Sequence, residues 1–477
     1  MTHRPYQTGL PLTVDPELPA PMFEQLYAQI RGRILRRELP GGAALPSSRR
    51  MASDLGVSRT TVLQALDALI AEGYLTASPR SAVRVSLEVA PPARRERLAP
   101  GPSVGAARVG GPPRAFRPGV PALDRFPIAE WTRAVTRAHR RASASTLEAA
   151  EGAGHPALRA AIAAHVASRG VRAAPEQVFV TSGTGAGVTE VLQQVITPGD
   201  AVWVEDPGYH GTRRAVLAAG GRPIPVRVDA DGIDVGAAIT RAPGARAALV
   251  TPSHHYPLGV TTSLGRRLQL LAWARATGAV VIEDDYDSEF RHRGRPVPPL
   301  AALDELGCVV YAGTFSKTVY PGLRIGFLVM PPRWVEPMAR WRATVGNPAS
   351  ILEQDALAAW IDSGGFARHL RRMRLVYRER AEAFVAALAA ECPELSLGPC
   401  DTGMQACAAI DGDDRAARDA AAAAGVEVGA LSDYCAEASL LDGLGSAASS
   451  SGLVFGFGAV RPEALVEGCR ALARALR

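Results

Sequence analysis

Five short apolar runs, separated by segments with helical periodicity, most constrain the fold of this chain of 477 residues. The runs span Val178 to Thr181, Ala201 to Glu205, Ala247 to Thr251, Ala279 to Glu283 and Val309 to Gly313. Apolar strands that alternate with helices are typical of an α/β domain with a mostly parallel sheet, because each helix carries the chain back across the sheet. The sequence therefore predicts such a domain.

Each run leads directly into a polar cluster. In chain order the clusters read TSGTGAG, EDPGY, TPSHHYPLG, EDDYD and GTFSK. Ligands of open α/β sheets bind beyond the carboxyl ends of the strands, where these clusters stand. We therefore expect five strand ends to converge on one site.

Lysine usage singles out one residue of the last cluster. The chain has 53 Lys and Arg residues, and Lys317 is the one lysine among them. A chain that otherwise uses arginine, yet keeps one lysine, indicates a need for an amine that can lose its proton. Lys317 follows the hydroxyls of Thr314 and Ser316 and precedes Arg324. An amine beside anion-binding groups predicts a Schiff base with the aldehyde of pyridoxal 5'-phosphate, and the alternative is an ordinary surface lysine.

The glycine-rich cluster is interpreted as a phosphate site. Gly183, Thr184 and Gly185 follow a predicted strand and open a predicted helix. Free backbone N–H groups and the positive end of the helix dipole favour a phosphate at such a position. A glycine-rich turn packed against the sheet is the alternative.

Two further clusters supply groups suited to a pyridine ring. A carboxylate at Asp284 would keep the ring nitrogen protonated, while the phenol of Tyr286 could bond the ring hydroxyl. Tyr209 could lie flat on the ring. The alternatives are a solvated acidic run at residues 283–285 and a plain turn residue at position 209.

Charge is unevenly divided along the chain, whose formal net charge is +6. Residues 1–117 hold 16 arginines against 9 acidic residues, a surplus of +7, and the remainder sums to −1. This surplus predicts a polyanionic partner for the N-terminal part.

Short amphipathic elements dominate the same part of the chain. The helical spacing of Phe23, Leu26, Ile30 and Ile34 predicts a first helix. A second helix is expected to be capped by Ser47 or Ser48, and a third by Ser58. A two-stranded wing is expected after them, from Tyr74-Leu75 and Val83 to Leu87, with a turn at Ser78-Pro79. Three helices with a wing indicate a small α+β domain.

The starts of the second and third helices carry residue types that contact DNA. They are Ser48 and Arg49 on the second helix and Ser58, Arg59, Thr60 and Thr61 at the third. A recognition helix presents its N-terminal residues to base edges, and arginine and hydroxyl side chains bind guanine and phosphate oxygens. These residues predict an interface for double-stranded operator DNA, with a helical protein-interaction module as the alternative.

Composition divides the chain into three parts. Residues 15–88 are expected to form the DNA-binding domain, and residues 89–115, rich in Pro, Gly and Arg without an apolar period, a linker. Residues 116–477 are expected to form the α/β domain, with 116–344 mainly in a large lobe and 345–477 mainly in a smaller C-terminal lobe.

Several other classes of protein are disfavoured. No run of about eighteen uncharged apolar residues and no signal-peptide core occur, so we expect a cytoplasmic protein without a membrane segment. The six cysteines are too scattered for a disulfide framework, and no histidine or cysteine motif indicates a metal. We therefore expect no metal cofactor.

Longer motifs in both halves of the chain resemble a known family. The stretch LPSSRRMASDLGVSRTTVLQALDALIAEGYL resembles the winged helix-turn-helix of GntR-type regulators, and EDPGY, TPSHHYPLG, EDDYDSEFR and GTFSKTVYPGLRIGF resemble fold type I aminotransferases. Their order is that of the MocR subfamily. The resemblance implies a multidomain, homodimeric regulator that holds pyridoxal 5'-phosphate in an aminotransferase-like domain and senses the cofactor or a small amine.

The resemblance also implies roles for single residues. Lys317 would carry the cofactor, Asp284 would face the pyridine nitrogen, Tyr286 would bond the ring hydroxyl and Tyr209 would stack on the ring. The phosphate would be held by Gly183, Thr184, Gly185, Thr314 and Arg324, with Ser316 beside them. Related aminotransferases place an Asn-Pro-x-Gly loop at the ring hydroxyl, whereas this chain has Tyr256-Pro257-Leu258-Gly259.

Two functions compete at this point: a regulator, or an active aminotransferase with an autoregulatory DNA-binding module. Many aminotransferases bind the substrate carboxylate with an arginine in the stretch that here reads Gly452 to Phe457, which has none. We therefore expect a regulator without net turnover and with transamination at most as a slow side reaction, whose effector is the cofactor itself or an amine that lacks a carboxylate.

Overall fold

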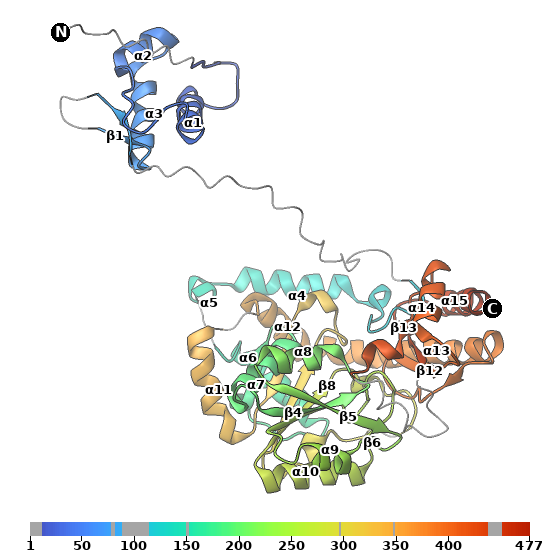
Figure 1. Ribbon diagram of the computed structural model, residues 1–477. Coiled ribbons are helices and arrows are strands. Elements are labelled where there is room, and N and C mark those ends of the chain that lie inside the picture. The colour runs from blue at the N-terminus through green and yellow to red at the C-terminus, as the bar shows by residue number, and fades with distance from the viewer. Residues whose placement is uncertain are drawn as a thin grey trace. The chain divides into compact units, whose positions relative to one another are not determined.

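The computed structural model describes residues 12–77, 82–87, 114–148, 152–294, 297–346, 349–436 and 451–477. These residues form two compact units, one before and one after residues 88–113 in the sequence (Figure 1). Of the expected linker, all but residues 114 and 115 lies outside the described residues. Each unit has its own hydrophobic core.

Three helices and a two-stranded sheet make up the N-terminal unit, as the sequence predicts. They are α1 (Met22–Leu35), α2 (Ser48–Leu55), α3 (Arg59–Ala71) and the antiparallel pair β1 (Leu75–Thr76) and β2 (Arg84–Val85). Leu26, Ile30 and Ile34 of α1 pack in one core with apolar residues of α3, as their helical spacing requires. The expected turn at Ser78-Pro79 lies outside the described residues.

Serine side chains set where α2 and α3 begin. Ser47 Oγ accepts a hydrogen bond from Arg50 N at 3.3 Å, and Ser58 Oγ accepts one from Thr61 N at 3.1 Å. Ser47 rather than Ser48 is therefore the cap of α2. The two caps fix the helix starts that carry the expected DNA-binding residues.

An eight-stranded sheet forms the centre of the C-terminal unit. Its strands lie in the order β3 (Val178–Thr181), β10 (Gly326–Val329), β9 (Val309–Thr314), β8 (Val280–Asp285), β7 (Ala247–Val250), β4 (Ala201–Asp206), β5 (Arg222–Asp229) and β6 (Gly232–Ile233). Strands β9, β8, β7, β4 and β5 are parallel, whereas β10 is antiparallel to β3 and β9, and β6 is antiparallel to β5. The mostly parallel sheet and its five predicted strands are confirmed.

Helices cover both faces of this sheet (Figure 1). Helices α7 (Thr184–Val195), α8 (His210–Ala218) and α11 (Pro332–Val345) pack on one face, and α9 (Val235–Arg241) and α10 (Leu264–Thr277) pack on the other. In β4, Val202 and Val204 join the first core and Trp203 joins the second, because successive side chains of a strand point to opposite faces. Burial on both faces explains why the strands are continuous apolar runs.

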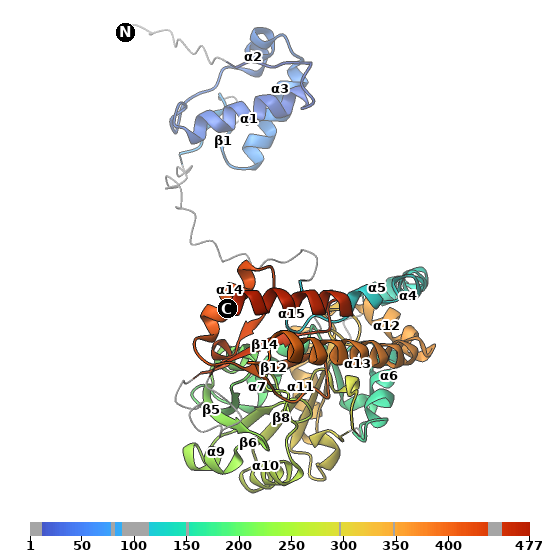
Figure 2. The same ribbon diagram turned by 90° about the vertical axis from the view of Figure 1, so that its right-hand side faces the viewer.

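A smaller sheet belongs to the C-terminal lobe (Figure 2). It is antiparallel, in the order β11 (Ser396–Leu397), β12 (Gln405–Ala409), β14 (Gly452–Gly456) and β13 (Gly429–Ala430). The long helix α13 (Gly365–Glu391) lies beside α15 (Pro462–Leu476), and both share a core with α14 (Asp414–Ala423) and this sheet. These elements form the smaller C-terminal lobe that the sequence predicts, and β14 lies within the stretch Gly452 to Phe457.

The remaining helices complete the C-terminal unit. They are α4 (Ile128–Arg141), α5 (Ala144–Glu148), α6 (Pro156–Ala167), α12 (Ile351–Asp362) and the 3-10 helices η1 (Leu123–Arg125), η2 (Pro175–Gln177), η3 (Ser288–Phe290), η4 (Leu300–Leu303), η5 (Pro321–Leu323) and η6 (Leu431–Tyr434). Helix α12 contacts both α4 and α6 in a core that contains Trp131 and Trp360. In the described part of the chain, no helix is both long enough and apolar enough to cross a membrane.

Candidate functional site

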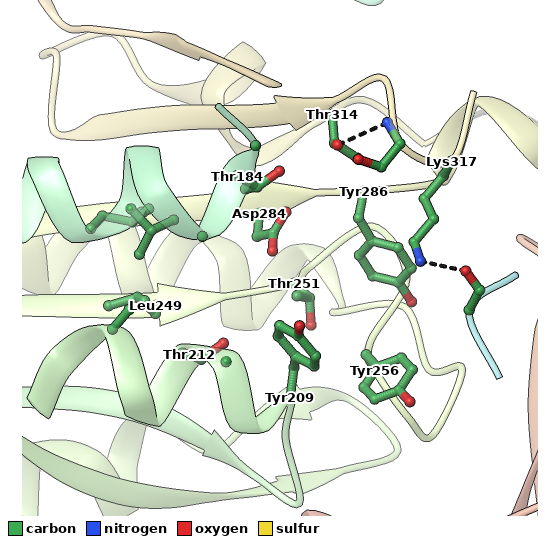
Figure 3. Close-up of a pocket in the computed structure, with 18 of the residues that line it drawn as sticks. Thr184, Tyr209, Thr212, Leu249, Thr251, Tyr256, Asp284, Tyr286, Thr314 and Lys317 are labelled. Carbon is green, nitrogen blue, oxygen red and sulfur yellow. Dashed lines mark hydrogen bonds between the residues drawn. The ribbon is translucent and has the colours of Figure 1, made fainter. Parts of the chain in front are cut away.

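The carboxyl ends of β3, β4, β7, β8 and β9 surround a cavity of about 480 Å³ (Figure 3). The residues expected at a cofactor all line it: Gly183, Thr184, Gly185, Tyr209, Asp284, Tyr286, Thr314, Ser316, Lys317 and Arg324. The five polar clusters meet here because neighbouring parallel strands end at the same edge of the sheet.

One end of the cavity has the donors that an anion requires. Gly183 is the N-cap of α7 with a φ of 111°, and the first backbone N–H groups of a helix have no partner within it. The guanidinium of Arg324 lies beside this turn, since a Cβ on Gly183 would be 3.5 Å from Arg324 Nη2. Ser316 N donates to Thr314 Oγ1 at 3.0 Å, which holds the turn after β9 in place. Such donors suit a phosphate.

An unpartnered carboxylate and the one lysine of the chain share the cavity. Asp284 Oδ1 is buried without a hydrogen-bond partner. Burial, and after it the charge of Asp285, raises the pKa of Asp284 to about 7, while Lys317 opposes the rise. Burial also lowers the pKa of the Lys317 amine, against the pull of Asp287 and Asp284. The cavity therefore offers a nucleophilic amine and a carboxylate oxygen that lacks a donor.

The Lys317 amine is tied to the start of the C-terminal unit. Its Nζ donates to Gly119 O at 2.5 Å (Figure 3). The segment around Gly119 is itself anchored, because Phe116 pairs with Gly456 in an antiparallel bridge. The lysine thus contacts the segment that follows the expected linker.

Tyr286 Oη lies between the side chains of Gln405 and His254. Gln405 Nε2 donates to Tyr286 Oη at 2.9 Å, and His254 Nδ1 lies 3.1 Å from the same oxygen. His254 Nδ1 also lies 2.7 Å from the buried Asp287 Oδ1, and a carboxylate is the stronger acceptor for the imidazole proton. The phenolic hydrogen of Tyr286 is therefore left to donate into the cavity.

Two more tyrosines form the outer part of the wall. Tyr209 is 50% exposed, and its ring meets that of Tyr256 at 88°, with centroids 5.9 Å apart. Tyr256 Oη donates to Tyr434 Oη at 3.0 Å. A pair of phenols thus lies at the loop where related aminotransferases carry the asparagine.

Gly119, Glu205 and Gln405 are among the lining residues that sequence reasoning missed. Glu205 Oε2 accepts hydrogen bonds from Thr251 N and Oγ1 at 3.0 and 2.6 Å, and burial raises the pKa of Glu205 to about 7. Its place in the EDPGY cluster was a usable signal. Gly119 and Gln405 lie outside the five clusters, and no local pattern marks them.

Together these groups fit the cofactor expected from the sequence. Asp284 Oδ1 is a buried acceptor for a protonated pyridine nitrogen, Lys317 is an amine for an aldehyde, and the α7 end with Arg324 suits a phosphate. Among the described residues, no group of three His, Cys, Asp or Glu side chains could hold a metal ion.

The cavity has little to bind a substrate carboxylate. Among the described residues that line it, Arg324 at the anion end is the one arginine. Arg213 lies outside the lining, 3.6 Å from Asp206 Oδ1, and donates to Tyr434 O at 3.1 Å. Val454 stands in the stretch where many aminotransferases place an arginine, and it is buried in an apolar cluster. An amino-acid carboxylate would find no free guanidinium in this wall.

The expected DNA-binding residues lie at the starts of α2 and α3. They are Ser48 and Arg49 of α2, and Ser58, Arg59, Thr60 and Thr61 at α3. Arg59 Nε donates to Ser48 Oγ at 3.3 Å, which joins the two helix starts. The hydroxyls of Ser58 and Thr61 lie 2.8 Å apart and are engaged with each other, whereas Thr60 and both arginines of the set are exposed.

Two family models match this chain, one in the N-terminal unit and one in the C-terminal unit. The model of the family described as bacterial regulatory proteins, gntR family, matches residues 23–85, and that of aminotransferase class I and II matches residues 119–438. The chain is 41% identical over 411 residues to the probable rhizopine catabolism regulatory protein MocR of Rhizobium meliloti, with 83% of each chain covered. It is 34% identical over 456 residues to the pyridoxine biosynthesis transcriptional regulator PdxR of Corynebacterium glutamicum, with 94% of each covered.

A solved structure supports the fold of the C-terminal unit. The chain matches the α-aminoadipate aminotransferase LysN of Thermus thermophilus, complexed with N-(5'-phosphopyridoxyl)-L-leucine, at 28% identity and a TM-score of 0.67. The match covers 76% of this chain and 91% of that one. The C-terminal unit therefore has the fold type I aminotransferase fold.

The substitution Asp284→Asn tests how much the charge of the Asp284 carboxylate lowers the free energy of unfolding. The pKa of Asp284 in the folded protein is about 7, above the ordinary value of about 3.9. Between these values the folded protein binds more protons than the unfolded chain, so stability falls as the pH rises through this range. We expect cofactor-free Asp284→Asn protein to be more stable than the wild type at pH 8, by up to about 4 kcal/mol, and to differ little near pH 4.

Urea unfolding followed by tryptophan fluorescence at the two pH values measures this difference. Glu289→Gln is the control of opposite sign, because the pKa of Glu289 is lowered to about 2 and its charge stabilises the fold at pH 8. Equal destabilisation by Asp284→Asn at both pH values would contradict the prediction.

Proposed function

The chain belongs to the MocR-type regulators, which join a GntR helix-turn-helix to an aminotransferase-like domain, and on that premise we propose that its C-terminal unit holds pyridoxal 5'-phosphate and controls DNA binding through it. The observation that carries the proposal is that one cavity holds the one lysine of the chain and Asp284, whose Oδ1 is buried without a hydrogen-bond partner. The relative PdxR is named as a regulator of pyridoxine biosynthesis.

The chain's own residues divide the work of holding the cofactor. The bound cofactor supplies an aldehyde and an electron-withdrawing ring. Lys317 provides the amine for the aldehyde, Asp284 accepts the ring N–H, and Tyr286 donates to the ring hydroxyl. The phosphate is held by Gly183, Thr184, Gly185, Thr314 and Arg324 with Ser316, and Tyr209 covers the open face of the ring.

The wall of the cavity favours sensing over turnover. A carboxylate buried without a partner costs several kcal/mol, and the described residues of the lining include no arginine beyond Arg324. The effector is therefore the cofactor itself or a small amine without a carboxylate. Net transamination of amino acids is not expected.

The contact between Lys317 and Gly119 gives the cofactor a route to the DNA-binding unit. Nζ donates to Gly119 O when the amine is free. An amine bonded to the cofactor has fewer hydrogens to donate, so the hold on this segment changes with occupancy. The segment continues directly from the linker and would pass the change toward the N-terminal unit.

The partners follow from the N-terminal unit and from the family. Residues 15–88 bind double-stranded operator DNA through Arg49, Arg59 and Thr60, with Ser48, Ser58 and Thr61 holding the helix starts. Residues 116–477 carry the cofactor and pair as a homodimer, since two-fold symmetry suits paired half-sites. The cytoplasm, where the DNA is, is the proposed location.

Removing the lysine tests the cofactor assignment. Wild-type protein loaded with pyridoxal 5'-phosphate should show a visible absorption band, and borohydride should fix the cofactor to the chain. Lys317→Ala should lose both, because the chain has no other lysine. Mass spectrometry of the reduced protein measures the adduct, and Arg371→Ala, an exposed change outside the cavity, should keep it. An adduct that persists in Lys317→Ala would overturn the assignment.

Two arginine substitutions test the DNA interface. Arg59→Ala should weaken binding to the specific operator by about 1 to 3 kcal/mol if it contacts a base, and Arg49→Ala should weaken all sequences alike if it contacts phosphate. Arg36→Ala is the control, because Arg36 pairs with Glu38 at 2.7 Å. Fluorescence anisotropy with operator and unrelated duplexes measures the affinities. Unchanged affinity in both test variants would refute the interface.

A further inference from the structure

A second cavity, of about 380 Å³, lies in the C-terminal unit and shares no lining residue with the first. Three arginines line it: Arg169 just after α6, Arg291 after η3 and Arg374 on α13, together with serine and threonine hydroxyls. Glu289 is the one carboxylate of its described lining. Positive groups therefore outnumber negative groups in this wall.

The three arginines differ in how far their charge is neutralised. Arg169 forms ion pairs with Asp285 at 2.7 Å and with Glu289 at 3.1 Å. Arg291 donates to a threonine hydroxyl at 3.2 Å, and Arg374 donates to a backbone carbonyl at 2.7 Å. Within the described part of the chain, neither Arg291 nor Arg374 has a carboxylate partner. Two guanidinium groups of the cavity wall are thus free to meet an anion.

Two polar atoms of the lining residues also lack partners. Ser253 is 4% exposed and its Oγ forms no hydrogen bond, and Arg291 Nε is buried without an acceptor. Unsatisfied buried groups cost free energy that a ligand with several acceptor oxygens would recover after a small shift of these side chains. Guanidinium groups with nearby hydroxyls are a donor set that proteins use for phosphate, because the planar fork matches two oxygens of one anion.

We propose that this second cavity is an anion site that binds a phosphate dianion, free or as part of a small phosphate ester, through Arg291 and Arg374. A phosphate has enough oxygens to accept hydrogen bonds from both guanidinium groups at once, whereas a carboxylate has only two oxygens to share between them. The site goes beyond the proposed function, because neither the cofactor nor the operator contacts these residues in that proposal. Ser253 would donate the additional hydrogen bond.

Calorimetric titration of the full-length, cofactor-loaded protein with inorganic phosphate tests the site. Arg374→Gln and Arg291→Gln should each weaken binding by about ten-fold, the loss expected for one charge-assisted hydrogen bond. Arg371→Gln is the matched control, since Arg371 is exposed on the same helix and does not line the cavity. Arg324→Gln, which removes the arginine of the first cavity, should leave phosphate binding intact. Arg374 is exposed, so its variant is expected to fold.

A second titration with glycerol 3-phosphate separates the sources of the anion. Tighter binding of the ester assigns the site to a phosphorylated metabolite, and tighter binding of inorganic phosphate assigns it to the free ion. The proposal is overturned if no saturable binding occurs, if Arg324→Gln abolishes binding while Arg374→Gln does not, or if Arg374→Gln lowers operator affinity without affecting phosphate, which would make the cavity a DNA contact.

Discussion

The unpartnered carboxylate of Asp284 is the constraint on which the rest of the site depends. A buried charge without a donor is costly, and the raised pKa of Asp284, about 7, expresses that cost. The apolar side chains of the surrounding strands cannot relieve it, because they pack on both faces of the sheet and carry no donor. Relief has to come from a ligand that brings an N–H to the cavity. The lowered pKa of the Lys317 amine and the anion-binding end of the cavity then indicate that the same ligand carries an aldehyde and a phosphate.

Much of the fold could be predicted from the sequence because its central strands are buried on both faces. Runs such as Val178–Thr181 carry their signal within a few residues, as do the serine caps of α2 and α3. Strands β5, β6 and β10 of this sheet were not predicted. β5 contains two prolines, which weaken a strand pattern, β6 has two residues, and β10 is a four-residue strand that begins at the end of the GTFSKTVYPGLRIGF motif. The topology that places β10 between β3 and β9 depends on long-range pairing that no local pattern encodes.

The site was predictable to the extent that its residues stand at strand ends. All ten expected cofactor residues line one cavity, since chain order and parallel pairing bring those ends together. Gly119 and Gln405 were missed because they belong to segments far from the five clusters in the sequence. Gly119 lies in the segment before α4, and Gln405 lies on strand β12. At the expected DNA interface, the hydroxyl of Ser58 caps helix α3, whereas the side chains of the neighbouring Arg59 and Thr60 are exposed.

Operator affinity, measured with and without pyridoxal 5'-phosphate in the same preparation of full-length protein, shows whether occupancy of the first cavity governs DNA binding. We expect the cofactor to change the affinity of the wild-type chain and to leave that of Lys317→Ala unchanged, because the contact between Lys317 and Gly119 is the proposed link between cavity and linker. An equal response of both proteins, or of neither, would contradict it.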